Sequence, residues 1–124
     1  MRETASWTWF FIAGIVMFAL LGLHMVVQHL SNVVLVFNPA GPDTVAWNNV
    51  VYRSRSVFFM VTYIVLLGAA LYHGFYGLRT IVGELGVKMQ AAKALDFVLW
   101  VVGIALFGFG TYAAVIAQSL EPIY

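Results

Sequence analysis

The stretch LYHGFYGLRTIVGELG, residues 71–86, determines the fold and the chemistry to be expected of this chain. It closes a long apolar run that contains one histidine, His73, with Gly77 one helical turn later, followed by Arg79 and Glu84. Ionisable side chains are costly inside a bilayer and usually face a bundle interior, a cofactor or an ion path. A partner must therefore be found for His73.

The composition of the whole chain is that of a membrane protein. Of 124 residues, 63% are hydrophobic and 9% are charged, and the mean hydropathy is +0.94. A formal net charge of +1 gives no reason to expect nucleic-acid binding. Cysteine is absent, so the chain can hold neither a disulfide nor an iron–sulfur cluster. Redox chemistry would need a cofactor held by histidine, or partner subunits.

Three apolar segments are long enough to cross a bilayer, for which about 20 helical residues suffice. We expect transmembrane helices at about 7–37, 57–82 and 95–117 in a single domain, residues 1–124. The start of the chain runs into the first segment without a small-residue cleavage site, which predicts a permanent helix. The sequence thus predicts an all-α membrane protein.

The first loop begins with the turn-forming sequence NPAGPD, residues 38–43. The spacing of apolar residues predicts a short interfacial helix at 44–52, capped by Asp43 or Thr44. Basic residues are unequally distributed: Arg2, Arg79, Lys88 and Lys93 lie at the N-terminus and second loop, and Arg53 and Arg55 lie in the first loop. This excess predicts a cytoplasmic N-terminus in a multi-pass protein of the plasma membrane.

The chemistry of a buried imidazole makes His73 a candidate axial ligand of a b-type haem. At 1.5 Å per residue, His73 lies about 10 Å from the cytoplasmic end of its span, His24 about 20 Å and His29 nearly 30 Å. Two histidines that ligate one iron must reach it from nearly the same depth. We therefore expect His73 and His24 to serve two haems, each with its other ligand from a different polypeptide.

His24 and His29 compete as the second ligand, because five helical residues place them about 140° apart around the helix. His24 lies deep in the apolar run, whereas His29 lies near the interface beside Ser31 and Asn32. We favour His24, with His29 as the alternative. For His73 and His24, a hydrogen bond to a neighbouring helix without any cofactor is the competing explanation. For His29, a solvated position at the interface is the favoured explanation.

Other residues near His73 have two explanations each. Gly77, with Ala69 and Ala70, leaves room for a flat macrocycle or for close helix packing. Arg79 could bind a haem propionate or a quinone carbonyl, or could be an interfacial anchor. Arg53 and Arg55 fit interfacial anchors better than propionate ligands. The glycines of the third span, Gly103, Gly108 and Gly110, indicate helix packing.

These residues give the chain a resemblance to the small cytochrome b membrane anchor of succinate:quinone oxidoreductase, the D-type subunit, over about residues 10–119. His73, Gly77 and Arg79 are similar to that family's H-x-x-x-G-x-R pattern, and Glu84 supplies an acidic residue eleven positions after the histidine. In the first span, residues 13–16 and His24 resemble a Ser/Thr-Gly-Val motif followed by a histidine about ten residues later.

The resemblance implies a non-catalytic subunit of succinate dehydrogenase, in a heterodimeric bundle with a second membrane anchor subunit. His73 would ligate the haem b nearer the iron–sulfur subunit and His24 a distal haem b, both shared with the partner anchor. A flavoprotein subunit would oxidise succinate, and membrane quinone would be reduced. Leu85 stands where several members have a quinone-bonding tyrosine, so we expect the quinone contacts mainly from the partner anchor.

Three alternatives remain. The chain could be a purely structural anchor of a respiratory complex, without haem, or the anchor of a fumarate reductase. A transporter subunit would need a polar path or a proline-broken helix through the bundle. Here the prolines lie outside the expected spans, and the third span is almost entirely apolar, which makes transport the weakest alternative.

Overall fold

The chain folds into helices, as its sequence predicts. The computed structural model describes residues 2–30 and 35–123, and the side chain of Arg2 lies outside that description. The long helices are α1 (Arg2–His29), α3 (Val57–Glu84) and α4 (Met89–Ile116), and a short helix, α2 (Trp47–Arg55), precedes α3. Two 3-10 turns, η1 (Leu35–Phe37) and η2 (Ala117–Ser119), complete the elements. The described residues contain no strand.

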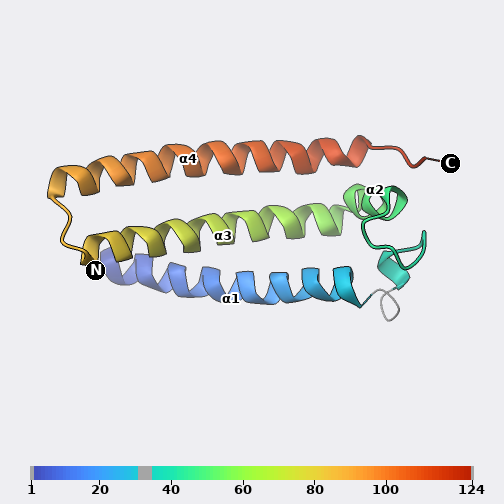
Figure 1. The fold of residues 1–124 in the computed structure, drawn as a ribbon, viewed down its shortest axis with the longest axis horizontal. Coiled ribbons are helices and arrows are strands. Elements are labelled where there is room, and N and C mark those ends of the chain that lie inside the picture. The colour runs from blue at the N-terminus through green and yellow to red at the C-terminus, as the bar shows by residue number, and fades with distance from the viewer. Residues whose placement is uncertain (1, 31–34, 124) are drawn as a thin grey trace.

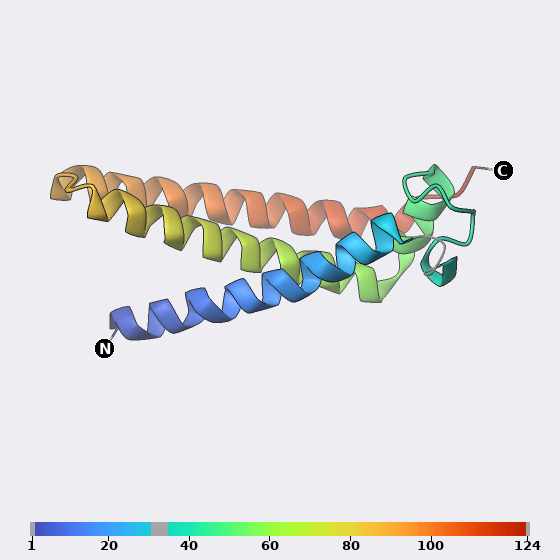
Figure 2. The same cartoon turned by 60° about the horizontal axis from the view of Figure 1, so that its bottom comes forward.

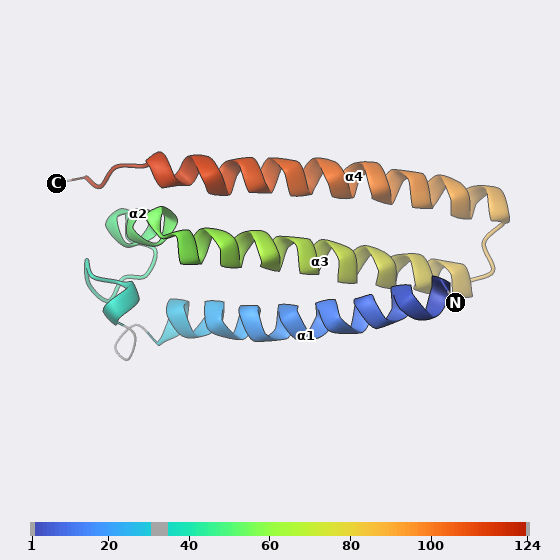
Figure 3. The ribbon, with the colours of Figure 1, turned by 180° about the vertical axis from the view of Figure 1, so that it is seen from behind.

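The three long helices lie in a row, with α3 between α1 and α4 (Figures 1 and 3). Successive long helices run in opposite directions, so the N-terminus and the loop between α3 and α4 share one end. The other end carries α2, which runs crosswise to the long helices, and the C-terminal segment (Figures 1 and 2). This arrangement leaves much of α1 and α4 without a neighbouring helix from the chain.

The three long helices are each apolar and long enough to cross a membrane, so this is a multi-pass membrane protein. Each has 28 residues and is therefore about 42 Å long, close to the total thickness of a bilayer. Within the described residues, the buried apolar side chains are those of Val27, Val51 and Phe59. Most apolar surface of the spans thus faces outward, as lipid or partner helices require.

Several helix boundaries differ from those expected. The first helix ends at His29, not near residue 37, and residues 31–34 of that expected span lie outside the described residues.

The prediction of Asp43 or Thr44 as the cap of α2 is wrong, because the N-cap is Ala46. Asp43 instead accepts a hydrogen bond from the amide of Val45 within the loop. The carboxylate of Asp43 thus makes a hydrogen bond within the loop and does not cap α2.

Helix α4 begins at Met89, six residues before the expected boundary at Leu95, because the polar first turns of the helix extend beyond the apolar span. At the other side of this loop, α3 ends where Gly86 takes a left-handed backbone with φ +70°. That conformation suits glycine and stops the helix.

Glycines set the distance between α3 and α4. A Cβ atom at Gly103 would lie 3.2 Å from the ring of Phe75, one at Gly68 would lie 3.2 Å from Phe107, and one at Gly110 would overlap Leu67. Each large side chain therefore occupies a notch on the opposite helix. The packing role expected of the third-span glycines is confirmed for Gly103 and Gly110. Gly108 has open space around it.

The loop cap, residues 35–55, is held by a buried polar network. Arg53 and Asn38 are almost fully buried, and the guanidinium of Arg53 donates hydrogen bonds to the side-chain oxygen of Asn38 and to the carbonyl of Thr44. Asn49 is also buried; its side chain accepts from the amide of Ala40 and donates to two loop carbonyls. The expectation that Arg53 is an interfacial anchor is therefore wrong, because the loop folds around its charge.

The C-terminal segment is attached to the loop cap. The indole of Trp47 donates to the carbonyl of Glu121 at 3.0 Å. Asn48 makes two hydrogen bonds of 2.9 Å with the backbone of Ile123, one as donor and one as acceptor. These bonds join the beginning of α2 to a segment more than 70 residues later in the chain.

Candidate functional site

His73 lies on α3, half-buried, with its ring directed at α1. Its Nδ1 atom is 3.0 Å from the carbonyl oxygen of Phe10. Since a carbonyl can only accept, Nδ1 carries the hydrogen and donates it. In the neutral ring, the lone pair then belongs to Nε2, and Nε2 is the nitrogen available to a metal.

Phe10 and Gly14 on α1 form the seat of this ring. The ring of Phe10 stacks on the imidazole with a centroid distance of 4.2 Å and an interplanar angle of 7°. Gly14 leaves the space that the imidazole fills, because a Cβ there would lie 3.0 Å from both Cε1 and Nδ1 of His73. The side chain is thus held by a hydrogen bond, a stacked ring and a glycine notch.

Gly77 completes a reciprocal contact between α1 and α3. A Cβ at Gly77 would lie 3.4 Å from the ring of Phe10, so Phe10 occupies the notch of Gly77 while His73 occupies that of Gly14. The space expected at Gly77 for a macrocycle is therefore filled by Phe10. Phe10 was not singled out in the sequence. Its spacing of four residues to Gly14 equals that of His73 to Gly77, but the match has a meaning only once the two helices are in contact.

The structure separates His24 from His73 by more than the sequence suggests. His73 lies level with Phe10 and Gly14, so His24 is ten to fourteen residues farther along α1, or about 15–20 Å. The expected difference of about 10 Å is too small because α1 begins at Arg2, earlier than the expected start at about residue 7, so His24 lies farther along its helix. The two histidines cannot ligate one metal ion. Within the described residues, no group of three His, Asp or Glu side chains could hold a metal.

The other two histidines have different surroundings. His24 is half-buried, and its ring meets Tyr63 of α3 edge-on with centroids 6.1 Å apart. Neither ring nitrogen of His24 has a hydrogen-bond partner among the described residues. His29 is the exposed last residue of α1. Of these two, His24 is the one placed between spans.

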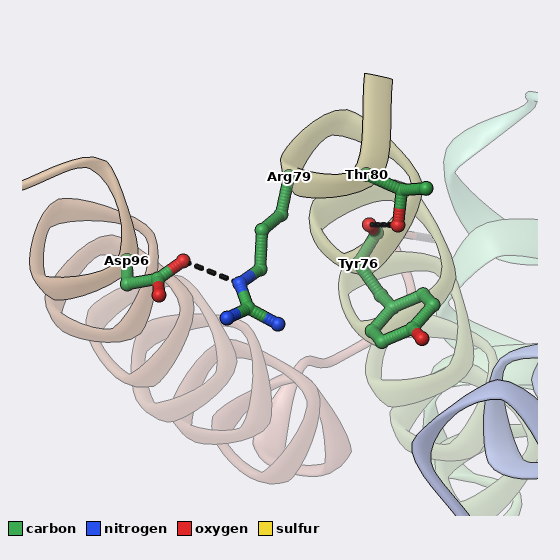
Figure 4. Close-up of polar contacts among 4 residues, drawn as sticks. All are labelled: Tyr76, Arg79, Thr80 and Asp96. Carbon is green, nitrogen blue, oxygen red and sulfur yellow. Dashed lines mark hydrogen bonds and ion pairs between the residues drawn. The ribbon is translucent and has the colours of Figure 1, made fainter. Parts of the chain in front are cut away.

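Arg79 is paired within the chain. Its Nε donates to Oδ1 of Asp96 on α4 at 2.6 Å, and this is the only ion pair among the described side chains (Figure 4). The side chains of Arg79 and Asp96 are 57% and 34% exposed, so the pair lies at the surface of the helix row. Asp96 was missed in the sequence; as an acidic residue just inside the apolar part of α4, it called for a basic partner.

Comparison with known proteins yields no match to a protein-family model, to a curated protein or to a solved structure. Functional inference therefore depends on the residues of this chain and their geometry. The strongest feature is a histidine on a membrane helix whose ring is fixed by three contacts, one of them between Nδ1 and a backbone carbonyl.

Proposed function

We propose that this chain is a membrane anchor subunit of succinate dehydrogenase, of the D-type cytochrome b family. In this proposal it binds haem b together with a second anchor subunit and supports electron transfer from an iron–sulfur subunit to quinone. The subunit itself has no catalytic residue. A flavoprotein subunit would carry the succinate-oxidising site.

The observation that carries the proposal is the hydrogen bond from Nδ1 of His73 to the carbonyl of Phe10. Metal-bound histidines usually donate their other ring nitrogen to a carbonyl or carboxylate, which fixes both the tautomer and the ring orientation. His73 already has that arrangement. A ligand that needs no reorientation on binding loses less conformational entropy.

Each residue of this chain has a defined part in the proposal. His73 would hold the proximal iron through Nε2, with Phe10 and Gly14 as positioning residues. His24, between α1 and α3, would hold a distal iron, and His29 is the less favoured alternative. Haem b, when bound, supplies one-electron transfer between the clusters and quinone. Arg79 would contact a propionate or a quinone only through the guanidinium nitrogens that Asp96 leaves unbonded.

The exposure of the side chains on α1 and α4 supports a partner subunit beside the three helices. None of the side chains of α4 is buried, and among the described side chains of α1 only Val27 is buried. A second anchor subunit would cover one side of the row and supply the opposite haem ligands. In this proposal the end that carries the N-terminus and the loop between α3 and α4 faces the cytoplasm of a plasma-membrane complex, as its excess of basic residues favours, and the iron–sulfur subunit would dock there.

A second function is favoured by the same contacts. The hydrogen bond and the stacked ring of Phe10 give His73 a partner within the chain. A purely structural anchor of a respiratory complex would use His73 in this way and bind no haem. A fumarate reductase anchor would share the haem-binding arrangement and differ in the direction of the reaction.

Haem stoichiometry separates these functions. A pyridine haemochrome assay on the purified complex gives b-type haem per mole, and we expect one or two. His73→Ala should remove one haem, while His29→Ala, at the exposed end of α1, should remove none. Full haem content in His73→Ala, or no haem in the wild-type complex, would exclude the haem-binding function and leave the structural one.

A further inference from the structure

A groove of about 710 Å³ runs between α3 and α4 on the surface of the helix row. Its walls are mainly aromatic and aliphatic, and include Tyr72, Phe75, Trp100, Ile104 and Phe107. Gly108 lines the end of the groove that is farthest from Asp96 along α4. Tyr76, Arg79 and Asp96 line the opposite end, near the loop between the helices. The groove is therefore apolar along its length and charged at one end.

The charged end lies close to the boundary between the hydrocarbon core and the lipid headgroups. Arg79 is five residues from the end of α3 and Asp96 seven from the start of α4, which is about 8 and 10 Å along the helices. Helices of about 42 Å extend about 6 Å beyond each side of a hydrocarbon core of about 30 Å. The ion pair is thus about 2–4 Å inside the core boundary, close enough for a lipid headgroup to meet it.

The ion pair leaves both a cationic donor and an anionic acceptor unused. Arg79 bonds Asp96 only through Nε, and its two terminal nitrogens point into the space between α3 and α4 (Figure 4). Within the described residues, Oδ2 of Asp96 has no hydrogen-bond partner. A purely anionic group would be attracted by Arg79 but repelled by Asp96. A headgroup that carries a phosphate and an ammonium side by side complements both charges.

We propose that this groove binds a zwitterionic amine phospholipid, with phosphatidylethanolamine chemistry. The phosphate accepts hydrogen bonds from the terminal nitrogens of Arg79, and the primary ammonium donates to the free carboxylate oxygen of Asp96. An acyl chain lies along the aromatic wall toward Gly108. The candidate haem ligands His73 and His24 do not line this groove, so the lipid does not depend on them. The phosphate would, however, occupy the terminal nitrogens of Arg79 and so replace a propionate or a quinone at that residue.

The test uses the full chain, with the subunits that co-purify, stripped of lipid in detergent. Samples are incubated with phosphatidylethanolamine, phosphatidylcholine or phosphatidylglycerol of identical acyl chains and repurified, and retained lipid is quantified by mass spectrometry. We expect retention of phosphatidylethanolamine about tenfold above phosphatidylcholine, which lacks ammonium N–H donors, and above the anionic lipid. Equal retention of all three, preferred retention of the anionic lipid, or displacement by an isoprenoid quinone would overturn the proposal.

Two pairs of variants locate the site. Asp96→Asn should abolish the preference for phosphatidylethanolamine over phosphatidylcholine, whereas Lys93→Gln, one turn earlier on α4, should preserve it. A Cβ atom at Gly108 would enter open space, so Gly108→Leu should fill that end of the groove and lower retention severalfold. Gly74→Leu, whose Cβ would also enter open space but outside the groove, should not. Unchanged lipid preference in Asp96→Asn, together with unchanged retention in Gly108→Leu, would place the lipid elsewhere. Circular dichroism confirms that each variant is folded.

Discussion

Replacing Gly14 by alanine tests the seat of His73 directly. The new Cβ would lie 3.0 Å from Cε1 and Nδ1 of the imidazole, whereas carbon contacts are ordinarily about 3.5–4.0 Å. The ring must then withdraw from α1 by about 0.5 Å. Its 3.0 Å hydrogen bond to Phe10 would lengthen to about 3.5 Å, beyond the usual limit for N–H donors.

The expected cost follows from these displacements. The lost hydrogen bond is worth about 0.5–1.5 kcal/mol, and overpacking adds about 1–3 kcal/mol. Alanine has a higher helix propensity than glycine, and this gain offsets about 1 kcal/mol of the two costs. Gly22→Ala on the same helix is a matched control, because its Cβ would enter open space and only the propensity gain remains. We expect Gly14→Ala to be less stable than Gly22→Ala by about 1.5–4.5 kcal/mol, because the propensity gain is common to both variants.

Equilibrium unfolding of the detergent-solubilised chain measures this difference. A double-mutant cycle with His73→Ala isolates the contact, since the cost of Gly14→Ala should disappear when the ring is absent. If Gly14→Ala and Gly22→Ala have the same free energy of unfolding, or if the cost persists without the imidazole, the described seat of His73 is incorrect.

Three further outcomes are expected. Gly110→Ala should destabilise the chain by about 1–3 kcal/mol in equilibrium unfolding, and Leu67→Ala should suppress this effect, because the new methyl group overlaps that leucine. Arg53→Met should lower the free energy of unfolding by about 2–4 kcal/mol and expose the loop cap to protease, since buried acceptors lose their donor; unchanged proteolysis would contradict the network. Asn48→Ala should cost about 1–2 kcal/mol for two lost hydrogen bonds and speed amide exchange at Ile123; wild-type exchange there would show that the C-terminal segment is held otherwise.

Part of the candidate site could be predicted because a histidine in an apolar helix is conspicuous. The bilayer makes an ionisable group costly, so His73 and His24 stand out from composition and depth alone. Arg79 was also conspicuous, but its partner was not, because the pair joins two helices. Phe10 was hidden for a similar reason: an apolar residue in an apolar span has no local signal that separates lipid contact from ring stacking.

The sequence by itself determined the class and the number of spans. Apolar runs longer than about 20 residues must satisfy their backbone internally in lipid, and a helix does so without reference to any other part of the chain. The tertiary structure alone decided how the helices are aligned along one another. That alignment depends on which side chain enters which glycine notch, as Phe10 does at Gly77 and His73 at Gly14, and such matches form only when two helices meet. The burial of Arg53 likewise required a folded loop, because its hydrogen-bond partners lie 9 and 15 residues away.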